Sequence, residues 1–253
     1  MSAIAIAVVV FACVFGSALL GLFLRTMLPE HHLSKESKDV VKLAMGLIAT
    51  MAALVLGLMT ASAKSSFDVQ NEETVHTAAN IIRLDRALAR YGPETKEIRD
   101  LLRRAVAFRI QLTWPEDGSA PRSLDSPELT RAAEGLEDKI SELSPRNELQ
   151  REFKSQAVQI TGDLLGTRWL RVAQLSNPVP LLFLVVLVFW LSILFGTFGL
   201  FAPHNVTVIA ALLLSAVAVA GSTFLILEMY RPFEGLMKIS PAPMRFALSQ
   251  LGQ

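Results

Sequence analysis

Hydrophobic and polar positions divide the chain into four apolar runs separated by polar stretches. The runs are residues 3–24, 43–63, 181–201 and 206–227, and none of them contains Lys, Arg, Asp or Glu. A bilayer core about 30 Å thick needs about 20 apolar helical residues, so each run is long enough to cross a membrane. A cleaved signal peptide would have a positively charged start and a shorter apolar core. We therefore interpret residues 3–24 as a span.

The stretch from 64 to 177 has no run of spanning length but follows the period of an amphipathic helix. Its apolar residues recur at three- and four-residue steps in two stripes, one at Ile81, Leu84, Leu88 and Tyr91 and one from Ile98 to Leu112. The first helix is expected to continue directly from the second span and to end at Gly92-Pro93. Arg83, Asp85, Arg86 and Arg90 are interpreted as a solvated charged face.

Two Ser-Pro pairs are typical of helix starts. Ser126-Pro127 and Ser144-Pro145 each place a capping serine before a proline in the first helical position. Residues 115–126, rich in Pro, Gly, Ser and Asp, are expected to form a loop. No stretch alternates as a strand would, so the segment is predicted to be a bundle of about four helices.

The predicted fold class is an all-α membrane protein with four transmembrane helices in a 2+2 arrangement and a central cytosolic helical bundle. The predicted domains are residues 1–63 with the first two spans, 64–177 as the soluble domain, 178–229 with the last two spans, and 230–253 as a cytosolic tail. Near the membrane, the side that carries the soluble domain has six positive residues and the other side has four. This bias favours a cytoplasmic soluble domain and cytoplasmic termini.

Composition and motifs exclude several classes of function. The net charge is +1, so no basic patch for nucleic acid is indicated. The single cysteine, Cys13, lies in an apolar run, and no Cys/His spacing suits a metal. Common motifs of hydrolases, zinc proteases and nucleotide-binding proteins are absent. We expect no catalytic residues, no metal and no cofactor. Because the spans contain no ionisable side chain other than Cys13, a proton-coupled transporter is also disfavoured.

The second span contains a stripe of small residues at successive four-residue steps: Ala49, Ala53, Gly57 and Ala61. Such stripes let helices pack closely in lipid. A ring of these helices, one from each subunit, would instead form the apolar wall of a pore. The residues alone leave both interpretations open.

Polar residues follow the stripe and the fourth span. Thr60, Ser62, Lys64 and Ser65 would offer hydrogen-bond donors and positive charge to an anion at a pore mouth, although such residues are also ordinary at a helix end. Beyond the fourth span, Glu228 precedes a compact turn. We expect a structural junction with the soluble domain, formed by Phe67, Asp68, Glu228, Pro232, Phe233 and Gly235.

Three strings resemble a bacterial family of uncharacterised membrane proteins with a bestrophin-like domain. They are ALVLGLMTASAKSSFDVQNEE at 53–73, RLDRALARYGPETKEIRDLLR at 83–103 and FLILEMYRPFEGLMKISPAPMRFAL at 224–248. The more distant resemblance is to bestrophins, which form homopentameric anion channels with a neck lined by the second span. It implies that Ala53, Gly57 and Ala61 line the pore. Some bestrophins bind calcium through acids near a similar turn, but Tyr230 stands where an acid is common, so no calcium is expected.

These features predict an oligomeric channel of the bacterial inner membrane that conducts inorganic anions such as chloride. The expected assembly is a homo-oligomer in the lipid bilayer, with a pentamer favoured over a tetramer. The alternative is a membrane-anchored signalling or scaffolding protein whose soluble helical domain binds a partner. A monomer or dimer in detergent would favour that alternative, because neither can surround a central pore as a ring.

Overall fold

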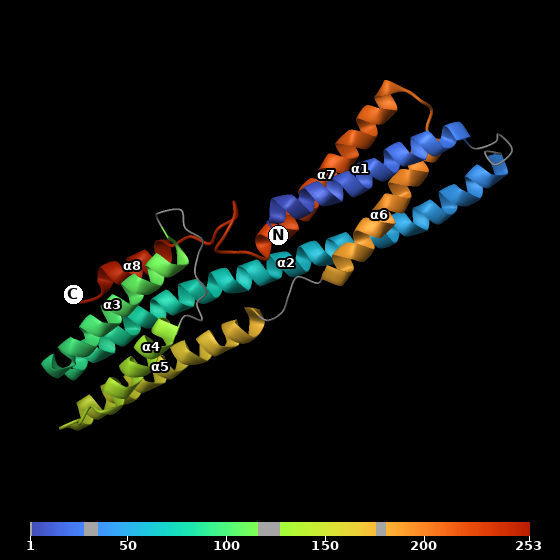
Figure 1. Cartoon of the computed structure of the whole chain (residues 1–253). Helices are drawn as coiled ribbons and strands as arrows, with labels where there is room; N and C mark the ends of the chain where they lie inside the picture. The colour runs from blue at the N-terminus through green and yellow to red at the C-terminus, as the bar shows by residue number, and fades with distance from the viewer. Residues whose placement is uncertain (1, 28–34, 116–126, 176–180) are drawn as a thin grey trace. The chain divides into compact units, whose positions relative to one another are not determined.

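A computed structural model describes the backbone of residues 2–27, 35–115, 127–175 and 181–253. Within these ranges the regular structure is helical, with no strand (Figure 1). The elements are α1 (Ala3–Met27), α2 (Lys35–Tyr91), the short 3-10 helix η2 (Pro93–Thr95), α3 (Lys96–Thr113), α4 (Pro127–Ser141), α5 (Glu148–Leu175), α6 (Leu181–Phe201), α7 (Val206–Met229) and α8 (Ala242–Gln250).

Four helices are long and apolar enough to cross a membrane, as the sequence predicts: α1, the first part of α2, α6 and α7. The bounds of α6 are those expected, whereas α1 and α7 extend a few residues beyond their apolar runs. Asn205 caps the start of α7, because its side chain accepts a hydrogen bond from the Thr207 amide. The 2+2 arrangement of the spans about a cytosolic bundle stays a prediction.

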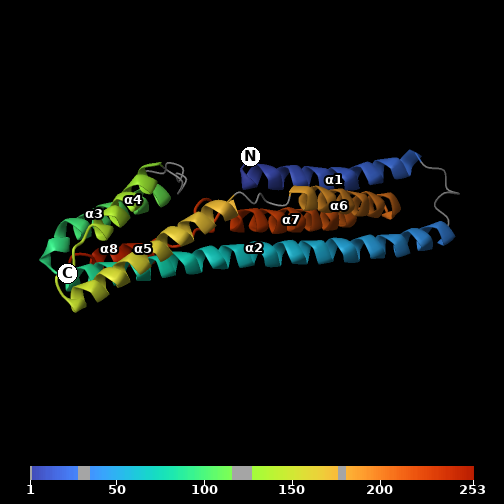
Figure 2. The ribbon, with the colours of Figure 1, turned by 90° about the horizontal axis from the view of Figure 1, so that it is seen from below.

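The second candidate span and the first helix beyond it are one uninterrupted helix. α2 has 57 residues and ends at Tyr91, immediately before Gly92-Pro93 (Figure 2). The predicted continuity and the predicted end are both confirmed. The polar residues 35–42 before the second apolar run are also helical and form the first turns of α2. By chain contacts the protein forms two compact units, 1–67 with 178–230 and 68–177 with 231–253.

The first unit is held by close packing of α1 against α6. A Cβ atom built on Gly21 would lie 1.9 Å from the Gly196 carbonyl oxygen, and one built on Gly199 would lie 2.1 Å from the Ala18 oxygen. Glycine is therefore required where the two backbones meet. Val14 and Ala18 of α1 are fully buried in the same core, together with Phe195 of α6 and Ala216 of α7.

The second unit has its own apolar core, to which α2, α3, α4, α5 and α8 contribute. Its buried members include Leu84 and Leu88 of α2, Leu102 of α3, Ile140 of α4 and Met244 of α8. Gly92 turns the chain between α2 and α3 with φ 145°, a conformation that favours glycine. The buried Thr95 hydroxyl closes this turn by donating to the Leu88 and Gly92 carbonyl oxygens at 2.6 and 2.8 Å.

One of the two expected Ser-Pro helix starts is wrong. α4 begins at Pro127 as expected, and its preceding serine lies outside the described residues. α5 begins at Glu148 rather than at Pro145. Asn147 is the capping residue, because its side-chain oxygen accepts a hydrogen bond from the Gln150 amide at 2.8 Å. The expected end of α5 at Asn177-Pro178 lies outside the described residues.

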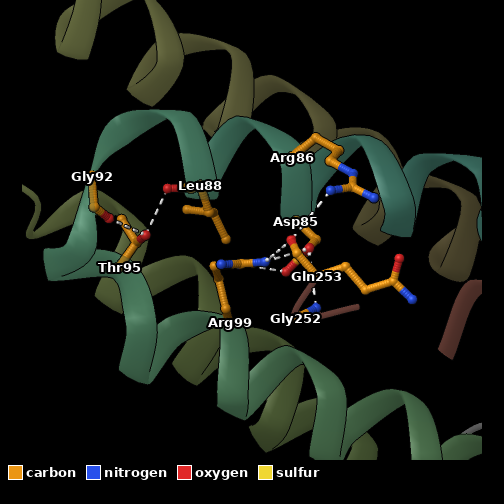
Figure 3. A network of polar contacts seen from close by, with 8 residues as sticks. All are labelled: Asp85, Arg86, Leu88, Gly92, Thr95, Arg99, Gly252 and Gln253. Atoms are coloured by element: carbon orange, nitrogen blue, oxygen red, sulfur yellow. Dashed lines mark hydrogen bonds and ion pairs between the residues drawn. The ribbon is translucent and has the colours of Figure 1, made fainter. Parts of the chain in front are cut away.

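α8, which the sequence pattern did not predict, is tied to the α2–α3 hairpin by a polar network (Figure 3). Asp85 is 1% exposed and accepts two hydrogen bonds from Arg99, at 2.7 and 2.9 Å. The Gly252 amide donates to the same carboxylate at 3.4 Å. Arg86 and Arg99 both donate to the Gln253 backbone oxygen, at 3.2 and 3.3 Å. The hydrogen bond from Arg99 to Asp85, opposed by burial and aided by the charges of Asp85 and Asp100, raises the pKa of Arg99.

The expected charged face of α2 is therefore wrong at one position. Arg83, Arg86 and Arg90 are exposed, but Asp85 points into the interior of the second unit. Its partner is on α3, fourteen residues further along the chain, and not on its own helix.

Candidate functional site

The second candidate span presents three different faces. One face is buried and includes Ala52, Met59 and Ala63, which pack in a cluster with Leu187 of α6 and Ile226 of α7. The small-residue stripe lies on a different, exposed side, where Ala49, Ala53, Gly57 and Ala61 are all exposed within one chain. A Cβ atom built on Gly57 would meet nothing within 4 Å. Packing within the chain therefore does not account for the stripe.

A third face, which the sequence analysis did not single out, is a ridge of leucines. Leu43, Leu47, Leu54 and Leu58 are 78%, 64%, 75% and 63% exposed. At 3.6 residues per turn, the centre of this leucine ridge lies roughly 90° around the helix from the centre of the stripe. The leucines are spaced by four, seven and four residues, a helical period visible in the sequence, but an apolar ridge in a span resembles an ordinary lipid-facing surface. The exposed side of α2 thus has a small face and a bulky face.

The residues expected at a pore mouth lie at the end of the stripe, on the exposed side of α2. The Thr60 hydroxyl donates to the Leu56 carbonyl oxygen of the preceding turn at 2.8 Å, which leaves its lone pairs and not its proton for a solute. Ser62 accepts a hydrogen bond from the Tyr230 hydroxyl at 3.4 Å. Lys64 and Ser65 are exposed. Ser62, Lys64 and Ser65 thus place hydroxyl groups and a positive charge at the exposed end of the stripe.

The residues expected at the junction lie in two groups. Phe67 packs in the core of the first unit with Trp190 of α6 and Tyr230, and Asp68 begins the second unit with an exposed side chain. Glu228 is only 5% exposed although it is the penultimate residue of α7. A buried acid at the end of a span is uncommon and indicates a specific local environment.

The turn after α7 is fixed against the end of α3. Pro232 is buried, and its carbonyl oxygen accepts a hydrogen bond from the Ile239 amide at 2.8 Å. Gly235 has φ 73°, which explains the glycine at this position. The Phe233 ring lies edge-on to Trp114 at 5.6 Å, and the Trp114 indole N–H donates to the Ile239 carbonyl oxygen at 2.8 Å. The sequence analysis did not include Trp114 among the junction residues, because nothing local identifies a partner 125 residues away.

The described residues contain no group of three or more His, Cys, Asp or Glu side chains that could hold a metal ion. The candidate site is a surface: a helix with an exposed weakly polar face, a basic and hydroxylic end, and a fixed turn after the last span. Such a surface can line a conduit or bind another membrane helix.

The fold of the described residues defines a class of protein, a helical membrane protein with four candidate spans. Comparison with known proteins agrees with it. The Bestrophin-like domain matches residues 11–244. The chain therefore belongs to the bestrophin-like domain family, which confirms the resemblance seen in its sequence. A comparison with curated proteins finds no match.

The fold is similar to solved structures of a bacterial bestrophin homologue from Klebsiella pneumoniae, each with a single substitution. One has a TM-score of 0.64 at 13% identity over 99% of this chain and 97% of that chain. A second has a TM-score of 0.58 at 15% identity over 94% and 97%. A third has a TM-score of 0.55 at 15% identity over 95% and 99%. At these identities the similarity establishes the fold alone.

Proposed function

We propose that this protein is the subunit of an oligomeric channel in a bacterial inner membrane, that it conducts inorganic anions such as chloride, and that α2 lines the pore. The observation that carries the proposal is the small face of α2. It belongs to a span whose buried face already packs against α6 and α7, and within one chain nothing lies within 4 Å of a Cβ atom built on Gly57. Membership of the bestrophin-like family supports a channel-type protein.

A single chain cannot enclose a pore with one helix face, so the proposal requires several copies in a ring. We propose a homo-oligomer, with a pentamer favoured and a tetramer possible, in which Ala49, Ala53, Gly57 and Ala61 face the conduit. Small side chains would leave a wide apolar throat, and an apolar throat can gate by dewetting where it narrows to a constriction.

Anion selectivity is proposed from the charge at the mouth of the conduit. Lys64 is exposed directly after the last position of the stripe, and the apolar run before it has no acidic side chain. Hydroxyl groups of Thr60, Ser62 and Ser65 add polarity at the same end. A ring of lysines contributed by several subunits would attract anions and repel cations. We place this end of α2, both termini and the second unit on the cytoplasmic side.

The experiment is a recording of purified protein in a planar bilayer under a chloride gradient. We expect unitary currents that reverse near the chloride potential. Gly57→Phe and Ala61→Phe should block or sharply reduce them, and Gly16→Phe on α1 is the matched control, because a Cβ atom there also meets nothing within 4 Å. Unchanged currents in both α2 variants would show that the small face does not line the pore.

A cysteine scan distinguishes the two exposed faces of α2. In a Cys13→Ser background, Ala53→Cys and Gly57→Cys should be modified by a charged thiol reagent that enters through the open channel, whereas Leu54→Cys and Leu58→Cys should not. Modification of the two cysteines on the leucine ridge alone would show that α2 lines the pore with the leucine ridge and not with the small face. Silent bilayers together with a monomeric or dimeric mass in detergent would favour the anchored scaffold instead.

A further inference from the structure

The chain that leaves α7 forms a closed loop, residues 231–239, called here the exit loop. Its base is fixed by two hydrogen bonds of 2.8 Å, from the Ile239 amide to the Pro232 oxygen and from the Trp114 indole to the Ile239 oxygen. Pro232 and Ile239 are buried, and Phe233 packs against the Trp114 ring. The base is therefore held in place by the second unit.

The tip of the exit loop is exposed and partly apolar. Gly235 turns the chain with φ 73°, and Leu236 and Met237 follow with 82% and 36% of their surface exposed. Among the large hydrophobic residues that the structure describes as exposed, 82% is the highest fraction, and only Val206 equals it. Val206 begins a candidate membrane span, so its exposure is expected. Leu236 is in no span and needs a different explanation.

The position of the tip along the chain supplies that explanation. Leu236 follows Met229, the last residue of α7, by seven residues, so at about 3.5 Å per residue it lies within about 25 Å of the end of the span. The charge of the tip also suits a position at the membrane surface. Arg231 is paired with Glu234 at 3.9 Å, and Lys238 is exposed beside the two apolar residues. Apolar side chains flanked by a cation are typical of segments that bind the membrane surface.

We propose that the exit loop is a membrane-surface anchor. Leu236 and Met237 insert at the boundary between the lipid headgroups and the acyl chains, and Lys238 lies among anionic headgroups. The fixed base makes the anchor rigid, so it would set the height of the second unit's Trp114 region above the membrane. The proposal requires α7 to be a span but does not depend on conduction, and it would stand if the channel proposal failed.

The test is a nitroxide spin label on Leu236→Cys in a Cys13→Ser background, with the full chain in nanodiscs. Leu149→Cys is the matched control. Leu149 is also an exposed leucine of the second unit, at 59%, but it lies near the start of α5, 26 residues before the helix ends. We expect the Leu236 label to collide with oxygen and to be shielded from a water-soluble nickel complex. The Leu149 label should show the opposite preference.

Lipid composition supplies the second measurement. In nanodiscs with phosphatidylglycerol the Leu236 label should lie deeper than in phosphatidylcholine alone, and Lys238→Gln should remove that difference. Nickel access to the Leu236 label in both lipids would place the tip in water and overturn the anchor. Shielding from both reagents with dipolar coupling between labels would show that a second copy covers the tip, which would also overturn it.

Discussion

Asp85 shows how one residue can stabilise a whole unit. Its carboxylate is almost completely buried, yet it accepts hydrogen bonds from Arg99 of α3 and from the Gly252 amide after α8. A buried charge is tolerated only when it is paired and hydrogen-bonded. Because Asp85 and its two partners come from α2, α3 and the chain end, the network joins these three segments. It supplies specificity that the apolar contacts of a short helix such as α8 cannot supply alone.

Replacement of Asp85 should destabilise the second unit strongly. Asp85→Asn leaves the Arg99 guanidinium without its counter-charge, and removing one partner of a buried pair costs about 3 kcal/mol. Thermal unfolding of the purified protein in detergent measures this. Arg83→Gln is the control, since Arg83 is an exposed neighbour on the same helix and should change stability by less than about 0.5 kcal/mol. An equal effect of both substitutions would contradict the assigned role of the network.

Single residues are where sequence reasoning was least complete. Asp85 lies in a run with Arg83, Arg86 and Arg90, and such a run is indistinguishable from a solvated face until its spatial partners are known. Trp114 has the same difficulty, because its hydrogen-bond partner is 125 residues away. The stripe, by contrast, is a regular repeat within one helix and could be located from the sequence, whereas its exposure within one chain could not.

At the scale of elements, the α1–α6 contact depends on backbone proximity. The carbonyl oxygens of Gly196 and Ala18 lie where the Cβ atoms of Gly21 and Gly199 would be, at 1.9 and 2.1 Å. In lipid, helices associate through this kind of close packing. Apolar side chains gain little there by exchanging contacts with acyl chains for contacts with one another. The two glycines therefore contribute more to the association of α1 with α6 than any exposed leucine or phenylalanine of these helices.

Alanine at either contact glycine should destabilise the first unit. In Gly21→Ala or Gly199→Ala the added methyl group forces the helices apart, and overpacking of this kind costs about 1–3 kcal/mol. Gly16→Ala is the matched control on α1, because its Cβ meets nothing within 4 Å. Unfolding in detergent should shift to lower temperature for the first two variants and stay unchanged or rise slightly for Gly16→Ala. A normal transition in Gly199→Ala would mean that the helices cross elsewhere.

Element bounds were predicted well wherever the length of an apolar run decided them. A span must match the bilayer thickness, so the predicted 181–201 coincides with α6. The start of α5 was mistaken because Ser144-Pro145 and Asn147 both satisfy the chemistry of a cap, and packing against Tyr91 decided between them: Gln150 in the first turn donates to the Tyr91 carbonyl oxygen at 3.0 Å. α8 was missed because a helix of nine residues, with Pro241 before it and Pro243 in its first turn, shows too little periodicity to be predicted.

The molecule has two compact units, and α2 belongs to both. One apolar cluster of the first unit contains Ala52, Met59 and Ala63 of α2, and the core of the second unit contains Ile81, Leu84 and Leu88 of the same helix. Between them, Lys64 and Ser65 are exposed and Ser66 and Phe67 partly exposed, and the helix continues without a break. Helix formation is cooperative along the chain, so an unbroken helix couples the stability of the units that it joins.

A proline in this bridging segment should uncouple the two units. Ser65→Pro removes the hydrogen bond to the Ala61 carbonyl oxygen and clashes with it, at a cost of about 3 kcal/mol or more, while leaving both cores intact. Trp190 lies in the first unit and Trp114 in the second. Two variants, one that keeps only Trp190 and one that keeps only Trp114, therefore allow the unfolding of each unit to be followed separately by tryptophan fluorescence. We expect coincident melting of the two reporters in the parent and in the Ser65→Ala control. In Ser65→Pro the two transitions should separate, since each core then unfolds on its own. Coincident transitions in Ser65→Pro would show instead that the units are coupled by contacts outside α2.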